Sequence, residues 1–173
     1  LDPIRHVVER AGEPRDVWHV HLGTGKLTRF TNSLANEAAP RFSPDGKWIA
    51  FESSRSGESQ IWVLPADGGE PRQFTSLSTG ASQPVWAPDG KSVAFVSAVF
   101  PENSDRPFLT SDSLNRIALD RLEKGKVKAE VFTGLLYRHW NDWVHGKRLH
   151  IFVQAFPSGT PVDLTPGNRD AVP

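Results

Sequence analysis

Hydrophobic and polar residues alternate along the chain in short segments that are separated by residues typical of turns. Residues 43–46 (SPDG) have the composition of a tight turn, because proline fixes φ at its second position and glycine accepts the left-handed conformation at its fourth. In the segment that follows, Ile49 and Phe51 fall on one face of a strand, whereas Trp48 and Ala50 fall on the other. Both faces are apolar, which predicts a sheet that is covered on both sides.

The same pattern returns along the chain with a period of 44 residues. Residues 41–51 (RFSPDGKWIAF) match residues 85–95 (VWAPDGKSVAF), which stand 44 positions later. Residues 61–75 match residues 151–165 in length and in pattern. Repeats of about 40–50 residues with four short strands each are typical of propeller blades. We therefore predict an all-β fold that is part of a β-propeller.

The repeat divides residues 1–173 into about two and a half four-stranded blades. The blade remnants are expected at residues 1–31, 32–75 and 76–165, and residues 166–173 are expected to lead into the next blade. Closed propellers have about four to eight blades, and an open stack would leave apolar blade faces in water. We therefore expect either further chain or self-association through the open blade faces.

An insertion of about 46 residues interrupts the third repeat at about residues 97–149. Within it, Ser111 or Asp112 is expected to cap a short helix that ends at Gly125. Residues 126–132 alternate as a strand does. A long insertion in a compact domain is often functional, so this segment is the first place to look for a site.

Five residues near the end of the insertion are candidates for binding a substrate or partner: Tyr137, Arg138, His139, Trp140 and Trp143. Aromatic rings stack on ligands, and an arginine pairs with a carboxylate. The alternative interpretation is that the aromatic rings fill the space between blades while the charged side chains stay in water.

Three histidines in the same region, His139, His145 and His150, raise the question of a metal site. Their spacings of six and five residues match no common zinc pattern. The sequence therefore predicts neither a metal ion nor another cofactor.

The composition excludes several classes of function. Twenty basic residues balance twenty acidic ones, so no broad electrostatic field favours nucleic acid or an anionic membrane surface. The longest mostly apolar run, residues 93–100, is too short to cross a bilayer. With no cysteine in the chain, thiol chemistry gives no sign of the compartment, and both the cytoplasm and the periplasm of a bacterium stay open.

The chain has no Gly-x-Ser-x-Gly sequence, which the nucleophile of an α/β-hydrolase requires. Residues 90–94 (GKSVA) come nearest, but they lack the second glycine and lie in a repeated strand. We therefore expect no catalytic residue in this chain.

Two segments resemble known families. Residues 41–75 look like the PD40 or TolB-type propeller repeat. Residues 127–153 are similar to a segment of bacterial serine peptidases of the prolyl oligopeptidase (S9) family, of the acylaminoacyl peptidase or dipeptidyl aminopeptidase type, although Asn141 and Leu149 depart from it. The resemblance implies a two-domain serine peptidase whose non-catalytic propeller restricts access to short peptides. Its Ser-Asp-His triad would lie in an α/β-hydrolase domain of the same polypeptide, outside these residues.

The alternative function is a TolB-like propeller that binds a partner protein and has no enzyme activity. The propeller fold alone does not separate the two, because propellers carry many functions. A hydrolase domain downstream would favour the peptidase, whereas an upstream α/β domain without a hydrolase would favour the scaffold.

Overall fold

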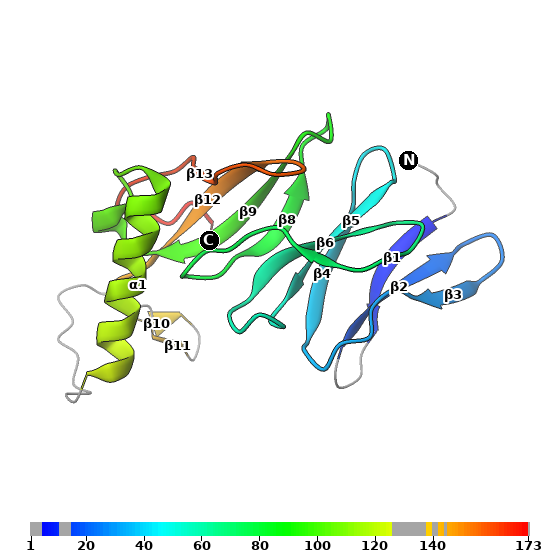
Figure 1. Ribbon diagram of the computed structural model, residues 1–173, viewed down its shortest axis with the longest axis horizontal. Coiled ribbons are helices and arrows are strands. Elements are labelled where there is room, and N and C mark those ends of the chain that lie inside the picture. The colour runs from blue at the N-terminus through cyan, green and yellow to red at the C-terminus, as the bar shows by residue number, and fades with distance from the viewer. Residues whose placement is uncertain (1–4, 11–14, 126–137, 140–141, 144, 173) are drawn as a thin grey trace.

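The computed structural model describes residues 5–10, 15–125, 138–139, 142–143 and 145–172. In this part of the chain, three antiparallel sheets of three or four strands follow one another in sequence order and lie side by side, and a two-stranded hairpin lies in the insertion of the third (Figure 1). The first sheet contains β1 (Arg5–Arg10), β2 (Asp16–His21) and β3 (Lys26–Arg29). The second contains β4 (Glu37–Phe42), β5 (Trp48–Ser53), β6 (Gln60–Pro65) and β7 (Arg72–Gln73). The third contains β8 (Ser82–Trp86), β9 (Ser92–Val99), β12 (Arg148–Ala155) and β13 (Val162–Asp163).

The four-residue turn forms as predicted in both of its copies. The backbone N–H of Gly46 donates to the Ser43 carbonyl over 2.9 Å, and Gly46 has φ +70°. The Ser43 hydroxyl donates to the Asp45 carboxylate over 2.6 Å, and the Lys47 N–H donates to it over 3.1 Å. These two hydrogen bonds, that of Ser43 first, hold the pKa of the Asp45 carboxyl below its usual value. The copy at residues 87–90 keeps the same backbone hydrogen bond, 2.9 Å long.

A threonine closes each of the three sheets in the same way. Its hydroxyl oxygen accepts a hydrogen bond from the backbone N–H of the residue 14 positions earlier, which lies in the third strand of the repeat. This bond connects the outer end of the sheet to its middle. The pairs are Thr31 with Val17 at 2.9 Å, Thr75 with Ile61 at 2.8 Å and Thr165 with Ile151 at 2.9 Å.

In each sheet, the residue directly before the N–H donor has a buried polar side chain. This side chain contacts the backbone of the residue that stands two positions after the threonine. The contacts are Asp16 with the Ser33 N–H at 3.4 Å, Gln60 with the Leu77 carbonyl at 2.7 Å and its N–H at 3.2 Å, and His150 with the Gly167 carbonyl at 2.9 Å. We call this contact the polar latch. It occupies one place in the repeat, although a different residue type makes it each time.

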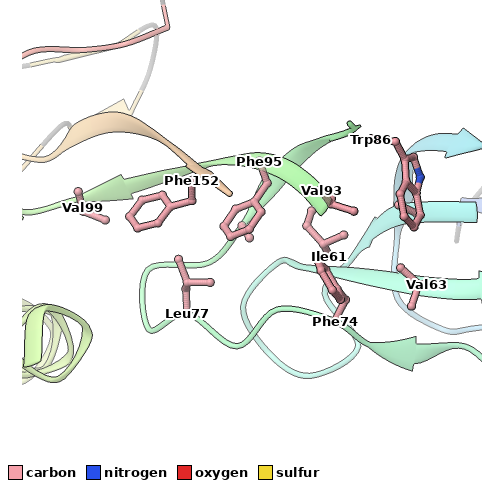
Figure 2. Close-up of a cluster of buried hydrophobic side chains, with 11 residues drawn as sticks. Ile61, Val63, Phe74, Leu77, Trp86, Val93, Phe95, Val99 and Phe152 are labelled. Carbon is pink, nitrogen blue, oxygen red and sulfur yellow. The ribbon is translucent and has the colours of Figure 1, made fainter. Parts of the chain in front are cut away.

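Two apolar cores separate the three sheets, and the second sheet contributes to both. Ile49 and Phe51 belong to the core shared with the first sheet, whereas Ala50 belongs to the core shared with the third. Figure 2 shows the second of these cores, in which Phe95 and Phe152 of the third sheet lie near Leu77. The prediction that this strand is covered on both faces is confirmed, and the fold is a propeller fragment with one short helix.

The insertion joins β9 to β12, which pair from Val99 opposite Arg148. It contains a 3₁₀ turn, η1 (Pro101–Asn103), and the helix α1 (Phe108–Lys124), followed by a hairpin of β10 (Arg138–His139) and β11 (Asp142–Trp143). In the described part of the chain, no helix is long and apolar enough to cross a membrane.

The predicted start of the helix is wrong, whereas its predicted end is confirmed. The helix begins at Phe108 directly after Pro107, three residues before Ser111, and Gly125 is its C-cap residue. Pro107 is the N-cap residue, with φ −53° and ψ 141°, and no side chain caps the first turn. The strand predicted at residues 126–132 lies outside the described residues.

Candidate functional site

The helix of the insertion is anchored at the junction between two blades. The Asp112 carboxylate accepts hydrogen bonds from the backbone N–H and the hydroxyl of Ser78, over 2.7 and 2.8 Å. The Arg116 guanidinium donates to the same hydroxyl over 3.2 Å. Ser78 lies in the connection from β7 to β8, which leads from the second sheet into the third. The helix is therefore positioned by the same loop that links the two blades.

The covered side of α1 carries both polar and apolar residues: Asn115 is buried, and Phe108, Leu114 and Leu119 are half-buried. The Asn103 amide donates to the Asn115 amide oxygen over 3.0 Å, and both side chains are buried. Phe108 packs edge-on against Phe152, with ring centroids 6.4 Å apart. Leu109, in contrast, is 74% exposed. The directional hydrogen bonds of Asp112 and Asn115 thus add to apolar packing through Phe108 in holding the helix in place.

A hollow of about 380 Å³ lies between the start of the insertion and the outer part of the third sheet. Phe108, Phe152 and three prolines supply much of its apolar wall: Pro107, Pro161 and Pro166. Arg106 and Asp105 also line it; their side chains are 52% and 83% exposed and stand 3.8 Å apart. An exposed ion pair of this kind is weak, so the guanidinium is available to another anion.

Two other polar side chains of the hollow, Ser104 and Asp163, make hydrogen bonds within the structure, and Ser111 and Thr160 line it as well. The Ser104 hydroxyl donates to the Pro101 carbonyl over 2.7 Å and accepts the Gly167 N–H over 2.9 Å. The Asp163 carboxylate pairs with His150 at 2.7 Å and accepts the Thr165 N–H at 2.9 Å. The apolar wall and the exposed guanidinium of Arg106 together suit an apolar side chain that lies near a carboxylate.

The structure brings part of the predicted binding set together. Arg138 pairs with Trp143 across the β10–β11 hairpin, through their backbones. His139 pairs in the same way with Asp142. Tyr137 and Trp140 lie outside the described residues. Ligand binding by these residues therefore stays a prediction.

Among the side chains that the structure describes, no three metal-binding groups gather, and the side chain of His139 lies outside that set. His150 lies within the third sheet as a polar latch and is fully buried. Sequence reasoning missed both this latch and the contact between Asp112 and Ser78. The one available signal for the second was Asp112 itself, which the sequence suggested as a helix cap.

Comparison with known proteins identifies the family to which the chain belongs. Residues 12–150 match the family model of the tricorn protease N-terminal beta propeller domain. Among curated proteins, an uncharacterized protein of Agrobacterium fabrum, Atu1656, is 42% identical over 53 residues, 31% of this chain and 18% of that protein. The Tol-Pal system protein TolB of Francisella tularensis is 38% identical over 56 residues, 31% of this chain and 13% of TolB. The matches thus span less than a fifth of these relatives.

Solved structures show the same fold at low sequence identity. A putative TolB from Agrobacterium tumefaciens superposes with a TM-score of 0.64 at 21% identity, over 98% of this chain and 50% of that one. The acylaminoacyl peptidase of Pyrococcus horikoshii gives 0.60 at 15% identity, over 94% and 23%. The tricorn protease gives 0.56 at 11% identity, over 95% and 12%.

Proposed function

Because this chain belongs to the family of tricorn protease N-terminal beta propeller domains, we propose that it is the non-catalytic propeller part of a bacterial serine peptidase that hydrolyses short peptides. In this proposal, an α/β-hydrolase domain of the same polypeptide carries the catalytic triad. The propeller restricts which peptides reach that domain, and the insertion of the third blade helps to exclude long peptides.

One observation carries the proposal. The family match extends over residues 12–150, so it includes both the blade repeats and most of the insertion. The insertion is also held firmly, because Asp112 fixes α1 to the junction of the second and third blades. A segment that selects ligands needs such a fixed position. The apolar hollow beside it provides room for a peptide side chain.

The first experiment uses the protein encoded by the complete gene and a fluorophosphonate probe, which labels activated serine nucleophiles. We expect the complete protein to be labelled and the 173-residue chain to stay unlabelled. Labelling of the 173-residue chain would contradict a non-catalytic propeller. An unlabelled complete protein that cleaves no peptide would contradict the peptidase.

The role of the insertion is tested by kcat/KM for a short and a long peptide substrate, measured on the complete protein that has not been treated with the probe. Asp112→Ala releases α1 from Ser78, so we expect the ratio of long-peptide to short-peptide kcat/KM to rise several-fold. Asp120→Ala is the matched control, because Asp120 pairs only across the helix surface with Lys124 at 3.2 Å in the described residues. An unchanged ratio for both variants would mean that the insertion does not select by length.

A TolB-like scaffold is the second candidate. It is favoured by the 38% identity to TolB over 56 residues and by the TM-score of 0.64 to a putative TolB. In this proposal, the rim of the propeller binds a partner protein and the polypeptide has no hydrolase domain. The absence of fluorophosphonate labelling from the complete protein is the outcome that separates it from the peptidase.

A further inference from the structure

The polar latch of the third sheet is a histidine that lies between two hydrogen-bond acceptors. The His150 side chain has no exposed surface, and both of its ring nitrogens make a contact. Nδ1 lies 2.7 Å from the Asp163 carboxylate, and Nε2 lies 2.9 Å from the Gly167 carbonyl oxygen. A carbonyl and an ionised carboxylate accept hydrogen bonds and do not donate them. Both contacts therefore require an N–H on the imidazole ring.

The complete latch contains one proton more than a neutral imidazole supplies. A neutral imidazole carries one N–H, whereas the imidazolium carries two. The latch is complete when the imidazolium faces the Asp163 carboxylate, or when the extra proton lies on the carboxyl group instead. Once this proton leaves, the remaining N–H serves either Asp163 or Gly167, and the other contact joins two acceptors. Loss of the proton thus breaks one half of the latch.

The latches of the other two sheets need no such proton. The Gln60 amide donates to the Leu77 carbonyl over 2.7 Å and accepts the Leu77 N–H over 3.2 Å, and an amide does not titrate. Asp16 accepts the Ser33 N–H over 3.4 Å as a carboxylate, without a proton of its own. The same place in the repeat is therefore sensitive to pH in the third blade and insensitive in the second.

The two partners of His150 connect this latch to the hollow beside α1. Asp163 lies in β13 and also accepts the Thr165 N–H over 2.9 Å. Gly167 donates its N–H to the Ser104 hydroxyl over 2.9 Å, at the start of the insertion. Ser104 and Asp163 both line the hollow. Because the Asp163 side chain is 13% exposed, the proton of the buried ring has a route to water.

The charged groups on the neighbouring elements make contacts elsewhere. Opposite His150 on β9 stands Ser97, which is uncharged, and Arg169 after β13 is exposed. The remaining charged groups are Arg148 and Asp170, which stand 3.9 Å apart, Arg106 and Asp105, which stand 3.8 Å apart, and Asp112 and Arg116, which both bind Ser78. Among the residues that the structure describes, Asp163 is thus the charged group that is hydrogen-bonded to His150.

We propose that the pair of His150 and Asp163 is a proton-dependent latch, which holds β13 and the start of the insertion in place when it is protonated and loosens both as the pH rises. The loosened state changes the wall of the hollow, so the shape of the hollow depends on pH. This proposal rests on the hydrogen bonds of the third sheet and does not depend on whether the complete protein is a peptidase.

The test measures amide hydrogen exchange by mass spectrometry in the protein encoded by the complete gene, at about pH 6 and at about pH 9. Each rate is divided by that of the same peptide in the unfolded protein at the same pH, which removes the intrinsic effect of pH on exchange. Residues 160–172 report on the latch of the third sheet. Residues 70–80 of the second sheet are the internal control, because Gln60 holds them.

We expect the protection of residues 160–172 to fall by roughly tenfold or more between the two pH values, while that of residues 70–80 changes much less. Equal changes in both segments would overturn the proposal. The exchange of the C2 hydrogen of His150 reports directly on the protonation of this ring. It should change over the same pH interval as the protection, and a ring that keeps one protonation state throughout would also overturn the proposal.

Two variants separate the proton from other effects of pH. In Asp163→Asn, the new amide N–H donates to Nδ1 of the neutral imidazole while its oxygen still accepts the Thr165 N–H, so the latch is complete without the extra proton. His150→Gln replaces the ring by the residue type of the second sheet. Both variants should keep nearly the same protection of residues 160–172 at the two pH values. A loss as large as that of the wild type in both variants would mean that another group is responsible.

Discussion

His150 illustrates how one position of the repeat keeps its role while its residue type changes. The imidazole is fully buried between Asp163 and the Gly167 carbonyl. A carbonyl only accepts hydrogen bonds, so the Nε2 of His150 carries a proton. Gln60 makes the equivalent contact in the second sheet, through its amide N–H and its amide oxygen. Either side chain makes a hydrogen bond to a backbone carbonyl two residues beyond the threonine.

We predict that His150→Ala lowers the free energy of unfolding by about 1–3 kcal/mol, because the Gly167 carbonyl and the Asp163 carboxylate each lose a hydrogen bond. His150→Gln should lose much less, since Gln60 already shows that an amide makes the latch. Urea unfolding of the two variants and the wild type measures both values. If the two variants lost the same amount, the latch hydrogen bonds would not be the source of the stability.

The latch was not predictable from the sequence because its three side chains share a position and not a residue type. Asp16, Gln60 and His150 all bind 17 positions ahead in the chain. Their partners are backbone atoms, which every residue type has, so the residue type at the partner position gives no signal of the contact. The tight turn was predictable for the opposite reason, because its geometry restricts which residues occupy positions 43–46.

At the level of elements, the strands were more predictable than the helix. Alternating apolar residues require a fixed strand register, so Ile49 and Ala50 face opposite cores as expected. The helix α1 instead turns the polar Asn115 inward and leaves Ile117 46% exposed. Its position depends on Asp112 and Ser78, which are 34 residues apart in the chain. No local pattern encodes such a contact.

We predict that Asp112→Ala loosens α1 without unfolding the sheets. The loss of two hydrogen bonds to a carboxylate should lower the local stability of the helix by about 1.5–3 kcal/mol, and amide exchange in α1 should become roughly tenfold faster or more. Hydrogen exchange followed by mass spectrometry measures this peptide by peptide. The control Asp120→Ala should leave exchange nearly unchanged, because its ion pair is exposed. Similar exchange in both variants would contradict the anchor.

At the scale of the whole molecule, the repeat predicted three sheets with apolar cores between them, and the structure agrees. The repeat did not predict that one blade has a charged pair of residues at two positions where another blade has apolar residues. Glu37 of β4 and Arg55 in the turn after β5 form a hydrogen-bonded ion pair, and Glu37 has no exposed surface. Ala81 and Val99 stand at the same repeat positions in the third sheet and are also buried. The candidate binding residues around Tyr137 had no repeat counterpart to guide their placement.

This exchange between blades leads to a prediction about the ion pair. Arg55→Val alone should lower the free energy of unfolding by about 3–5 kcal/mol, because it leaves the buried Glu37 carboxylate without a counter-ion. Glu37→Ala alone should cost less, since the Arg55 side chain is 21% exposed and still lies over the Trp62 ring at 4.8 Å.

The double variant Glu37→Ala with Arg55→Val copies the pair of the third sheet, so it should recover most of the stability lost by Arg55→Val alone. Urea unfolding of the four proteins closes the double-mutant cycle. A double variant as unstable as Arg55→Val would show that the surroundings of the second blade are built for the charged pair. Recovery would instead mean that the repeat accepts either pair at this position, and that the ion pair contributes little net stability to the propeller.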